Sequence, residues 1–379
     1  MMRKICLFAN TDWYLYNFRL DFARALKLAG FDVLLVSPDG PYRKRIEEMG
    51  FRWLPIPVSR RGINPVNEIR VLLQILHLYR EEKPDIVHHF TIKCVFYGST
   101  AAHLAGIKKI VNSITGMGYV FTGGGLKKSL LRFLAVNWYR LVLNGTRVIF
   151  QNRDDQAYFL EEGIIGPKEA VFIAGSGVNI ERFLPSTALK VGAPLVVLAS
   201  RMLYDKGIGE YVEAARRIRQ MGVNARFVLI GNIDTGNPSA IPLSQIEAWH
   251  QEGCIEWWGW REDMPEVYRQ ADIACLPSYY REGLPKMLIE AGACGLPCVT
   301  TDFAGCREVV RNEENGLLVR PRDVESLVAA LRRLLLDDSL RKKMGKRSRE
   351  IVEEQFGLSV IIEKTLQVYE ELVPGEHGS

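Results

Sequence analysis

The sequence predicts an α/β protein of two domains, each a Rossmann-like, doubly wound parallel sheet. A chain of 379 residues is longer than one ordinary hydrophobic core organises. Short apolar runs alternate with helical patterns along it, which is typical of βαβ units. The segment 183–187, with its central proline, reads as a linker after which a fresh series of strands begins. We therefore expect a first domain at 1–185, a second domain at 186–356 and a final helical segment at 357–379.

The first domain is predicted from apolar runs that alternate with helical segments. The expected strands are Lys4–Phe8, Asp32–Ser37, Arg52–Ile56, Ile86–His88, Lys109–Val111 and Arg147–Phe150. The expected helices are Arg19–Ala29, Tyr42–Met49, Val66–Glu82 and Leu126–Leu143. In a sheet of this kind, ligands bind in the crevice at the carboxyl ends of the strands.

The second domain repeats the pattern. Its expected strands are Pro194–Ala199, Arg226–Ile230, Ile255–Trp258, Ile273–Pro277 and Pro297–Thr300. A last helix over Ser359–Leu372 has no strand after it, and we expect it to pack back on the first domain.

Charge is divided unevenly between the two halves. Residues 1–190 hold 26 Lys and Arg against 16 Asp and Glu, whereas residues 191–379 hold 23 against 28. A basic half indicates an anionic partner, such as a membrane surface or a phosphorylated acceptor. Nucleic acid is not expected, because no nucleic-acid-binding motif is present. Seven cysteines without zinc-binding or CxxC spacing indicate thiols in a reducing cytosol, and no stretch has the length of a membrane span.

The segment 282–290 begins and ends with a glutamate, with seven residues between the two, and Gly283, Leu284 and Pro285 follow the first glutamate. Proline suits the first position of a helix, so Glu282 is expected in the preceding loop and Glu290 in the second turn. A helix start binds anions through its free N–H groups and its positive dipole end. The segment therefore suits a diphosphate with hydroxyl-rich groups at both ends, as in a nucleotide sugar.

Arg201 and Lys206 follow the first strand of the second domain, in a short loop that ends at Gly207. Taken alone, the loop could equally be a solvated surface turn. At a switch-point crevice, however, the two cations would face the charge that develops on a phosphoryl leaving group. The segment 282–290 in the same domain favours that functional interpretation.

A basic amphipathic stretch with aromatic residues spans Leu126–Val148. Such a helix can lie on an anionic membrane, and it can equally be an ordinary helix that covers a sheet. Basic clusters at 43–45 and at Arg60-Arg61 favour the membrane interpretation.

Other candidates have a structural interpretation beside the functional one. His88 and His89 end a strand, so at most one is expected to reach the crevice, and a core histidine explains them equally well. Trp260 could stack on a base, although core packing explains most of the tryptophans at 257–260. Gly177 belongs to a broken GxG pattern, which is a weak signal. The aspartate pairs at 154–155 and 337–338 indicate helix capping, and no metal site is expected.

Several short motifs follow one another in a characteristic order. They are Gly177-Val178-Asn179, Ser200-Arg201, Lys206-Gly207, the segment 282–285, Glu290-Ala291, Gly295-Leu296-Pro297 and the segment 315–319. This order resembles that of the retaining glycosyltransferases of family 4, which have the GT-B fold. Phe18-Arg19, Asn64-Pro65, Thr91-Ile92-Lys93 and the segment 114–118 resemble the subgroup that elongates sugars linked to undecaprenyl diphosphate.

The resemblance implies a GT-B fold with an interdomain cleft between an acceptor-binding domain at 1–185 and a nucleotide-sugar-binding domain at 186–356. It also assigns roles to matching residues. Arg201 and Lys206 would hold the donor diphosphate, Glu282 would face the transferred sugar, and Glu290 would bond the ribose hydroxyls. Further donor contacts are expected at Gly177, Trp260 and the segment Gly283-Leu284-Pro285. Acceptor or first-domain contacts are expected at Arg60, Asn64, His89, Lys93, Thr115 and Gly116, although Thr115 replaces a histidine that many relatives carry.

The hypothesis is a retaining, metal-independent glycosyltransferase of surface polysaccharide or glycan biosynthesis. It would move a hexose or N-acetylhexosamine from a UDP-sugar, without a further cofactor, to a polyprenyl-diphosphate-linked saccharide. Its expected place is the cytoplasm, in peripheral contact with the anionic inner membrane. Two alternatives stay open: a sugar-nucleotide epimerase on the same fold, and a nucleotide-sugar-binding protein without turnover, for which Thr115 is the only hint.

Overall fold

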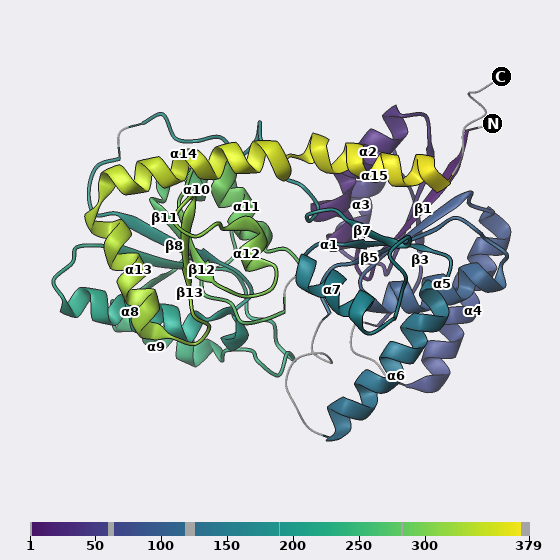
Figure 1. Ribbon diagram of the computed structural model, residues 1–379, viewed down its shortest axis with the longest axis horizontal. Coiled ribbons are helices and arrows are strands. Elements are labelled where there is room, and N and C mark those ends of the chain that lie inside the picture. Colours follow the sequence, from purple (N-terminus) through teal and green to yellow (C-terminus); the bar gives the residue numbers. More distant parts are fainter. Residues whose placement is uncertain (1, 60–63, 118–125, 189, 282, 373–379) are drawn as a thin grey trace. The chain divides into compact units, whose positions relative to one another are not determined.

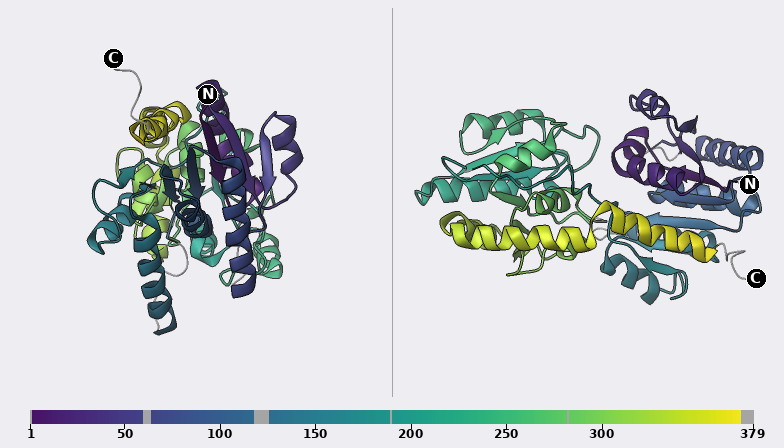
Figure 2. Two further views of the ribbon diagram at one scale, coloured as in Figure 1. Left: turned by 90° about the vertical axis from the view of Figure 1, so that its right-hand side faces the viewer. Right: turned by 90° about the horizontal axis from the view of Figure 1, so that it is seen from above.

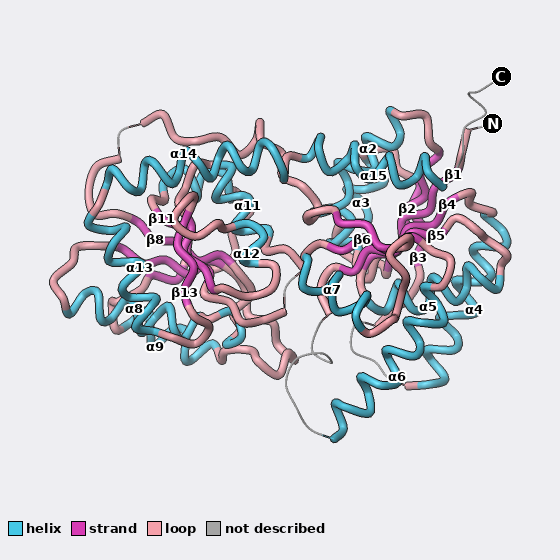
Figure 3. The backbone as a smooth tube through the Cα atoms, viewed as in Figure 1, coloured by secondary structure: helices cyan, strands magenta, loops and turns pink. Residues whose placement is uncertain are grey.

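The computed structural model describes residues 2–59, 64–117, 126–188, 190–281 and 283–372. The chain divides into two compact units (Figure 1): Met1–Ser176 with Ile361–Ser379, and Gly177–Val360. In each unit the strands form a central layer with helices on both sides, as the colouring of Figure 3 shows. The α/β class expected from the sequence is confirmed.

The sheet of the first unit has seven parallel strands in the order β3-β2-β1-β4-β5-β6-β7. Chain order reverses between β1 and β4, so a crevice is expected at the carboxyl ends of these two strands. The strands are β1 (Lys4–Phe8), β2 (Asp32–Ser37), β3 (Arg52–Pro55), β4 (Ile86–Phe90), β5 (Ile110–Ile114), β6 (Arg147–Phe150) and β7 (Ala170–Phe172).

Helices connect these strands and cover both faces of the sheet (Figures 1 and 2). They are α1 (Asp12–Tyr14), a π-helical turn (Leu15–Arg19), α2 (Leu20–Leu28), α3 (Arg43–Glu48), α4 (Pro65–Glu82), α5 (Ile92–Leu104), α6 (Leu126–Leu143) and α7 (Arg153–Glu161). The start of α4 follows local rules, because Pro65 occupies the first turn and the Asn64 side chain accepts a hydrogen bond from the Val66 N–H at 3.1 Å.

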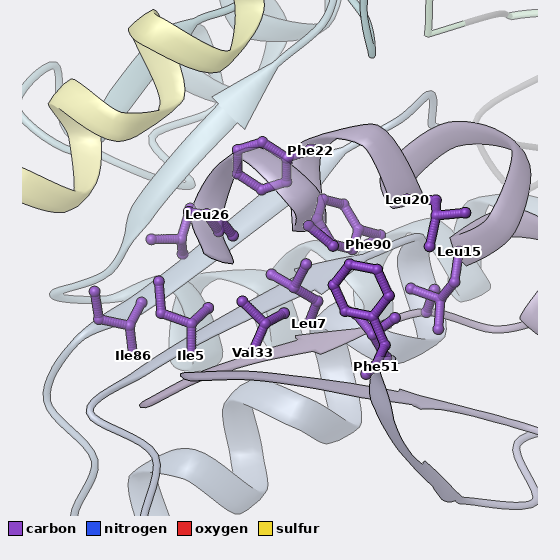
Figure 4. Close-up of a cluster of buried hydrophobic side chains, with 14 of the residues drawn as sticks. Ile5, Leu7, Leu15, Leu20, Phe22, Leu26, Val33, Phe51, Ile86 and Phe90 are labelled. Atoms are coloured by element: carbon purple, nitrogen blue, oxygen red, sulfur yellow. The ribbon is translucent and has the colours of Figure 1, made fainter. Parts of the chain in front are cut away.

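The largest core of the first unit lies between the sheet and α2. Figure 4 shows Phe22 and Leu26 of α2 close to the strand residues Ile5, Leu7 and Val33. The last helix, α15 (Leu358–Leu372), contributes Ile361, Val368 and Tyr369 to the same core. Most of this terminal helix therefore belongs to the first unit, although it is the last element in the chain.

The sheet of the second unit has six parallel strands in the order β10-β9-β8-β11-β12-β13. Its chain order reverses between β8 and β11. The strands are β8 (Leu195–Ala199), β9 (Arg226–Ile230), β10 (Glu256–Trp257), β11 (Ile273–Leu276), β12 (Cys298–Thr301) and β13 (Gly316–Val319). The helical segments are a 3₁₀ turn (Tyr204–Lys206), α8 (Ile208–Gln220), α9 (Leu243–Gln251), α10 (Met264–Gln270), α11 (Lys286–Ala293), α12 (Cys306–Val309), α13 (Val324–Leu336) and α14 (Asp338–Gln355).

The boundary between the units differs from the one expected at residue 185, because residues 177–185 lie with the second unit. Val178 forms a parallel bridge with Gly357. The Arg349 guanidinium donates hydrogen bonds to the carbonyl oxygens of Ile180 and Phe183, at 3.1 and 2.7 Å. These long-range bonds attach the expected linker to the end of α14.

Candidate functional site

The candidate site lies at the carboxyl ends of β8 and β11, the adjacent strands at which the second sheet reverses its order. The loop after β8 carries Arg201 and Lys206, and the loop after β11 carries Tyr279 and Tyr280. The connections after these two strands diverge to opposite sides of the sheet, which leaves an opening where ligands bind in α/β proteins. Both cations lie at the edge of the sheet that their place in the sequence predicts.

Backbone hydrogen bonds and one glycine hold the two loops together. The Asp205 carbonyl oxygen accepts from the Tyr279 N–H at 3.0 Å and from the Ser278 hydroxyl at 3.3 Å. Gly207 has φ +74°, and a Cβ at this position would lie 2.1 Å from the Pro277 carbonyl oxygen. Only glycine fits so close an approach, so Lys206 is held directly against the end of β11.

Lys206 is a buried cation, with 8% of the residue exposed. Its ammonium lies 5.4 Å from the centre of the Tyr280 ring. Burial, and next the positive charge of Arg201, lower the pKa of the Lys206 ammonium to about 7. The charge of a negative ligand in this place would oppose both effects and favour the charged form of Lys206.

Arg201 is oriented by a carboxylate from the neighbouring loop. Its Nη1 lies 2.7 Å from Oδ2 of Asp234, in the loop after β9, and its guanidinium lies 6.0 Å from the Tyr280 ring centre. The Arg201 side chain is 41% exposed. The remaining guanidinium N–H groups can therefore donate to a phosphate while Asp234 fixes the orientation of the side chain.

Glu290 lies in the second turn of α11, as expected. The helix begins at Lys286 with Pro285 as its N-cap, one residue later than the sequence predicted. The Tyr268 hydroxyl donates to Glu290 Oε2 at 3.4 Å, and the Lys286 ammonium lies 3.7 Å from Oε1. Burial raises the pKa of the Glu290 carboxyl, while the charge of Lys286 opposes that shift.

The other donor-site candidates lie at several places in the second unit. Glu282 lies outside the described residues, while Gly283 is buried and Leu284 half-buried ahead of α11. Gly177, with φ +77°, precedes the bridge between Val178 and Gly357, so its conformation serves that junction. Trp260 follows the edge strand β10 and is 48% exposed, which leaves its ring accessible for stacking.

His89 is a core residue, and the expected acceptor contact at this position is not supported by the structure. The residue is fully buried, its Nε2 lies 2.9 Å from the Tyr79 hydroxyl, and its Nδ1 lies 2.8 Å from Asn112 Oδ1. His88 is buried in the same way, with Tyr369 Oη 2.6 Å from Nδ1 and Ser113 Oγ 2.8 Å from Nε2. Burial lowers the pKa of both imidazoles, so both are neutral core groups.

The remaining first-unit candidates lie near the starts of helices and at strand ends. Asn64 caps α4, and the Lys93 ammonium lies 2.8 Å from Glu68 Oε1. Thr115 and Gly116 follow β5 and are half-buried. Arg60 lies outside the described residues. Thr115 and Gly116 thus lie at a strand carboxyl end, and Asn64 and Lys93 lie at the starts of α4 and α5.

No helix in the ranges that the structure describes is long and apolar enough to cross a bilayer. Across the same ranges, no three or more His, Cys, Asp or Glu side chains come together as a set that could hold a metal ion.

Two family models match the chain, and together they cover most of it. The model described as "Glycosyl transferases group 1" matches residues 179–351. The model described as "Glycosyl transferase 4-like" matches residues 4–153. The chain is a glycosyltransferase.

Curated relatives are similar to the glycosyltransferase over nearly its whole length. The N,N'-diacetylbacillosaminyl-diphospho-undecaprenol alpha-1,3-N-acetylgalactosaminyltransferase of Campylobacter jejuni is 27% identical over 372 residues, 95% of this chain and 96% of the relative. The UDP-Gal:alpha-D-GlcNAc-diphosphoundecaprenol alpha-1,3-galactosyltransferase of Escherichia coli is 25% identical over 356 residues, 90% of each chain. Both similarities extend across both units of the glycosyltransferase.

Solved structures show the same architecture. A glycosyltransferase from Rickettsia africae has a TM-score of 0.81 at 19% identity, covering 99% of this chain and 100% of its own. Sucrose-phosphate synthase from Thermosynechococcus elongatus has a TM-score of 0.81 at 20% identity, covering 98% and 99%. Anabaena HepE in complex with UDP has a TM-score of 0.77 at 17% identity, covering 97% and 100%. The GT-B fold of the glycosyltransferase is confirmed.

Three partners at the site were not predicted from the sequence: Asp234, Tyr280 and Tyr268. Asp234 belongs to a polar loop after β9, and Tyr280 to the loop after β11. A search for polar or aromatic residues at the end of every predicted strand would have found these two. Tyr268 lies within α10, and its position inside that helix gives no signal of a contact with Glu290.

Proposed function

We propose that this glycosyltransferase transfers a hexose or an N-acetylhexosamine from a UDP-sugar to a saccharide linked to a polyprenyl diphosphate. The observation that carries the proposal is the pair of cations, Arg201 and Lys206, on one loop at the switch point of the second sheet. The names of the Campylobacter and Escherichia relatives support the acceptor class. The UDP bound by the Anabaena neighbour supports the nucleotide.

The proposed reaction breaks the bond between sugar C1 and the β-phosphate oxygen, and forms a bond between C1 and an acceptor oxygen. Arg201 and Lys206 stabilise the negative charge that grows on the departing UDP. The acceptor hydroxyl enters on the face from which UDP leaves, so the configuration at C1 is retained. Its proton passes to the departing phosphate oxygen, and no metal ion or further cofactor is required.

The two glutamates would position the donor. Glu290, with the Tyr268 hydroxyl beside it, would accept hydrogen bonds from the ribose hydroxyls. Glu282 would face the transferred sugar. Neither glutamate is proposed as a nucleophile, because stabilising the charge on the leaving group is proposed to supply most of the catalysis.

The work of the enzyme is proposed to take place in the cytoplasm, at the cytoplasmic face of the inner membrane, in the synthesis of a surface polysaccharide. The polyprenyl chain holds the acceptor in that membrane, so the enzyme would have to approach it peripherally. The comparisons give the epimerase alternative no support. Retention of Arg201, Lys206 and Glu290 argues against a binding protein without turnover.

The proposal is tested by incubating the protein with a panel of UDP-sugars and an undecaprenyl-diphosphate-linked saccharide, while UDP release and the product are followed. We expect UDP release only when donor and acceptor are both present, together with an acceptor enlarged by one sugar. A donor converted to its epimer without acceptor would support the epimerase. Donor binding without either product would support the binding protein.

A further inference from the structure

The helix α6 exposes apolar side chains along residues 130–141, on the face that points away from the sheet. Leu130, Leu134, Trp138 and Leu141 recur at helical spacing, and Phe133 and Leu131 flank them. Phe133 is 64% and Leu141 74% exposed. The opposite face, with Val136 and Tyr139, is buried in a core of the first unit. The helix is therefore apolar on both faces, although only one of them is covered by the protein.

A second apolar strip lies on α4. Val66, Ile69 and Leu73 are each more than half exposed and follow helical spacing, while Val71, Ile75 and Tyr79 are buried. Together with α6, this strip holds nine of the twenty large apolar side chains that are exposed in the described parts of the chain. Such concentration on two helices is unusual for a protein surface that faces only water.

The two strips lie on either side of α5. The rings of Trp138 of α6 and Phe96 of α5 are stacked, with their centres 4.6 Å apart. The Lys93 ammonium of α5 lies 2.8 Å from Oε1 of Glu68 of α4. Both α4 and α6 project from the body of the first unit in the same direction, as the left view of Figure 2 shows. The N-terminal end of each helix lies on the side of the strand carboxyl ends, because a helix that follows a parallel strand starts at the carboxyl end of that strand.

The charge of α6 indicates what covers this surface. Its sequence, LKKSLLRFLAVNWYRLVL, contains four basic residues and no acidic one. Four basic residues in the sequence of a helix that exposes leucine and aromatic side chains match a surface with a negative head-group layer and an apolar interior. We propose that the exposed apolar strips of α4 and α6 form one docking surface for an anionic lipid bilayer.

The proposal deepens the proposed function, on which it rests, by naming the part of the enzyme that meets the membrane. The docking surface is at the strand carboxyl edge of the first sheet, where the switch point between β1 and β4 also lies. An enzyme held in this way would present that edge to a diphosphate at the level of the head groups. The surface would enter only the interfacial layer, as a peripheral helix does.

The test is sedimentation of the full-length protein with vesicles. Phosphatidylglycerol-containing vesicles are compared with pure phosphatidylcholine vesicles, for the wild type and two triple variants. One variant carries Leu130→Gln, Phe133→Gln and Leu134→Gln, and the other carries Val66→Gln, Ile69→Gln and Leu73→Gln. The matched control replaces exposed apolar residues of the second unit: Met221→Gln, Leu243→Gln and Leu336→Gln. Circular dichroism checks that each variant is folded.

We expect the wild type and the control to bind the anionic vesicles, and each docking variant to bind at least tenfold more weakly. Transfer to a water-soluble acceptor without a lipid chain should keep its kcat/KM in both docking variants. Equal binding of all proteins, or equal binding of the wild type to both vesicle types, would overturn the proposal. So would docking variants that alter only the oligomeric state, since the strips would then be a protein interface. Failure of the wild type to use the water-soluble acceptor would count against the proposed function alone.

Discussion

At the scale of single residues, the most informative side chain is Lys206. A buried ammonium is costly unless an anion stabilises it, and here burial and the neighbouring Arg201 bring its pKa to about 7. The Asp234 carboxylate forms an ion pair with the neighbouring Arg201. Binding of a diphosphate would therefore favour the protonated form of Lys206 and lower the free-energy cost of burying its ammonium group.

Replacing Lys206 should impair chemistry more than folding. We expect Lys206→Ala to lower kcat/KM for transfer by about a hundredfold or more, the scale of losing one group that stabilises leaving-group charge. Steady-state UDP release measures it. Lys342→Ala, which removes a lysine 78% exposed on α14, is the control and should leave kcat/KM unchanged. Near-wild-type turnover of Lys206→Ala would refute the assigned role.

The pH dependence of donor binding should report the same lysine. The ammonium is charged below its pKa of about 7 and neutral above it, whereas the two phosphates of a UDP-sugar keep their charge. A bound diphosphate raises the pKa, so binding takes up a proton above pH 7 and the affinity falls as pH rises. We expect up to about a tenfold loss per pH unit between about pH 7.5 and 9. Titration calorimetry should show this fall of donor affinity with pH in the wild type. If Lys206→Ala shows the same pH dependence, a group other than Lys206 is responsible for it.

Glu290 should matter for holding the donor and not for the chemical step. Glu290→Gln keeps the size of the side chain but removes the charge that would strengthen hydrogen bonds to the ribose. We expect the donor KM to rise about tenfold with little change in kcat, as for an interaction equal in ground and transition states. Glu363→Gln, at an exposed position of α15, serves as the control. A fall in kcat at constant KM would instead indicate a role in the transition state.

At the scale of elements, the central strands were predictable and some helices were not. Strands such as β1 and β9 are buried apolar runs of the length that periodicity predicts. The helix α5 was missed because residues 94–99 are all buried, so its sequence lacks a polar face. The first helical segment begins at Asp12 and passes through a π-helical turn, a distortion for which the sequence pattern has no signal.

The candidate site was predictable in part, for a similar reason. Arg201 and Lys206 could be placed because they directly follow an apolar strand, and strand ends meet at one edge of a parallel sheet. Their partner Asp234 could not, because the contact depends on how the loop after β9 folds over the loop after β8. His89 was ambiguous because strand position alone does not show that Tyr79 and Asn112 satisfy its ring.

The loop at the site should depend on Gly207. Gly207→Ala places a Cβ within 2.1 Å of the Pro277 carbonyl oxygen and forces alanine to φ +74°. The left-handed conformation alone costs about 1–2 kcal/mol, so we expect a lower melting temperature and at least a tenfold weaker affinity for the donor. Differential scanning calorimetry measures the first effect. Gly209→Ala, in α8 with open space around its Cβ position, is the control and should not lower stability. Equal effects of Gly207→Ala and Gly209→Ala would contradict the claim that the close approach of Gly207 to Pro277 holds this loop.

At the scale of the whole molecule, the order of elements in the chain differs from their order in space. The end of the chain returns to the first unit, where Tyr369 of α15 bonds His88 of β4 across 281 positions of sequence. The expectation of a last helix without a strand of its own came from the chain pattern. The core that it completes, with Ile361 and Val368 beside the strands of the first sheet, required the structure.

The stability of the first unit should therefore depend on the last helix. Tyr369→Phe removes the hydroxyl that bonds His88 at 2.6 Å, and it should lower the free energy of unfolding by about 1–3 kcal/mol because a buried imidazole nitrogen loses its partner. Tyr369→Ala also leaves a cavity in the core and should cost about 3–5 kcal/mol. Hydrogen exchange followed by mass spectrometry resolves where protection is lost.

Amides of β1 and β4 should exchange faster in both Tyr369 variants, while those of β8 and β11 keep their protection, because the tyrosine packs in the core of the first unit. Leu336→Ala, at an exposed position of α13, is the control and should leave both sheets unchanged. Equal loss of protection in β1 and β8 would mean that the two units unfold as one. A graded response, larger for alanine than for phenylalanine and confined to the first sheet, is the pattern that a terminal helix completing a distant core requires.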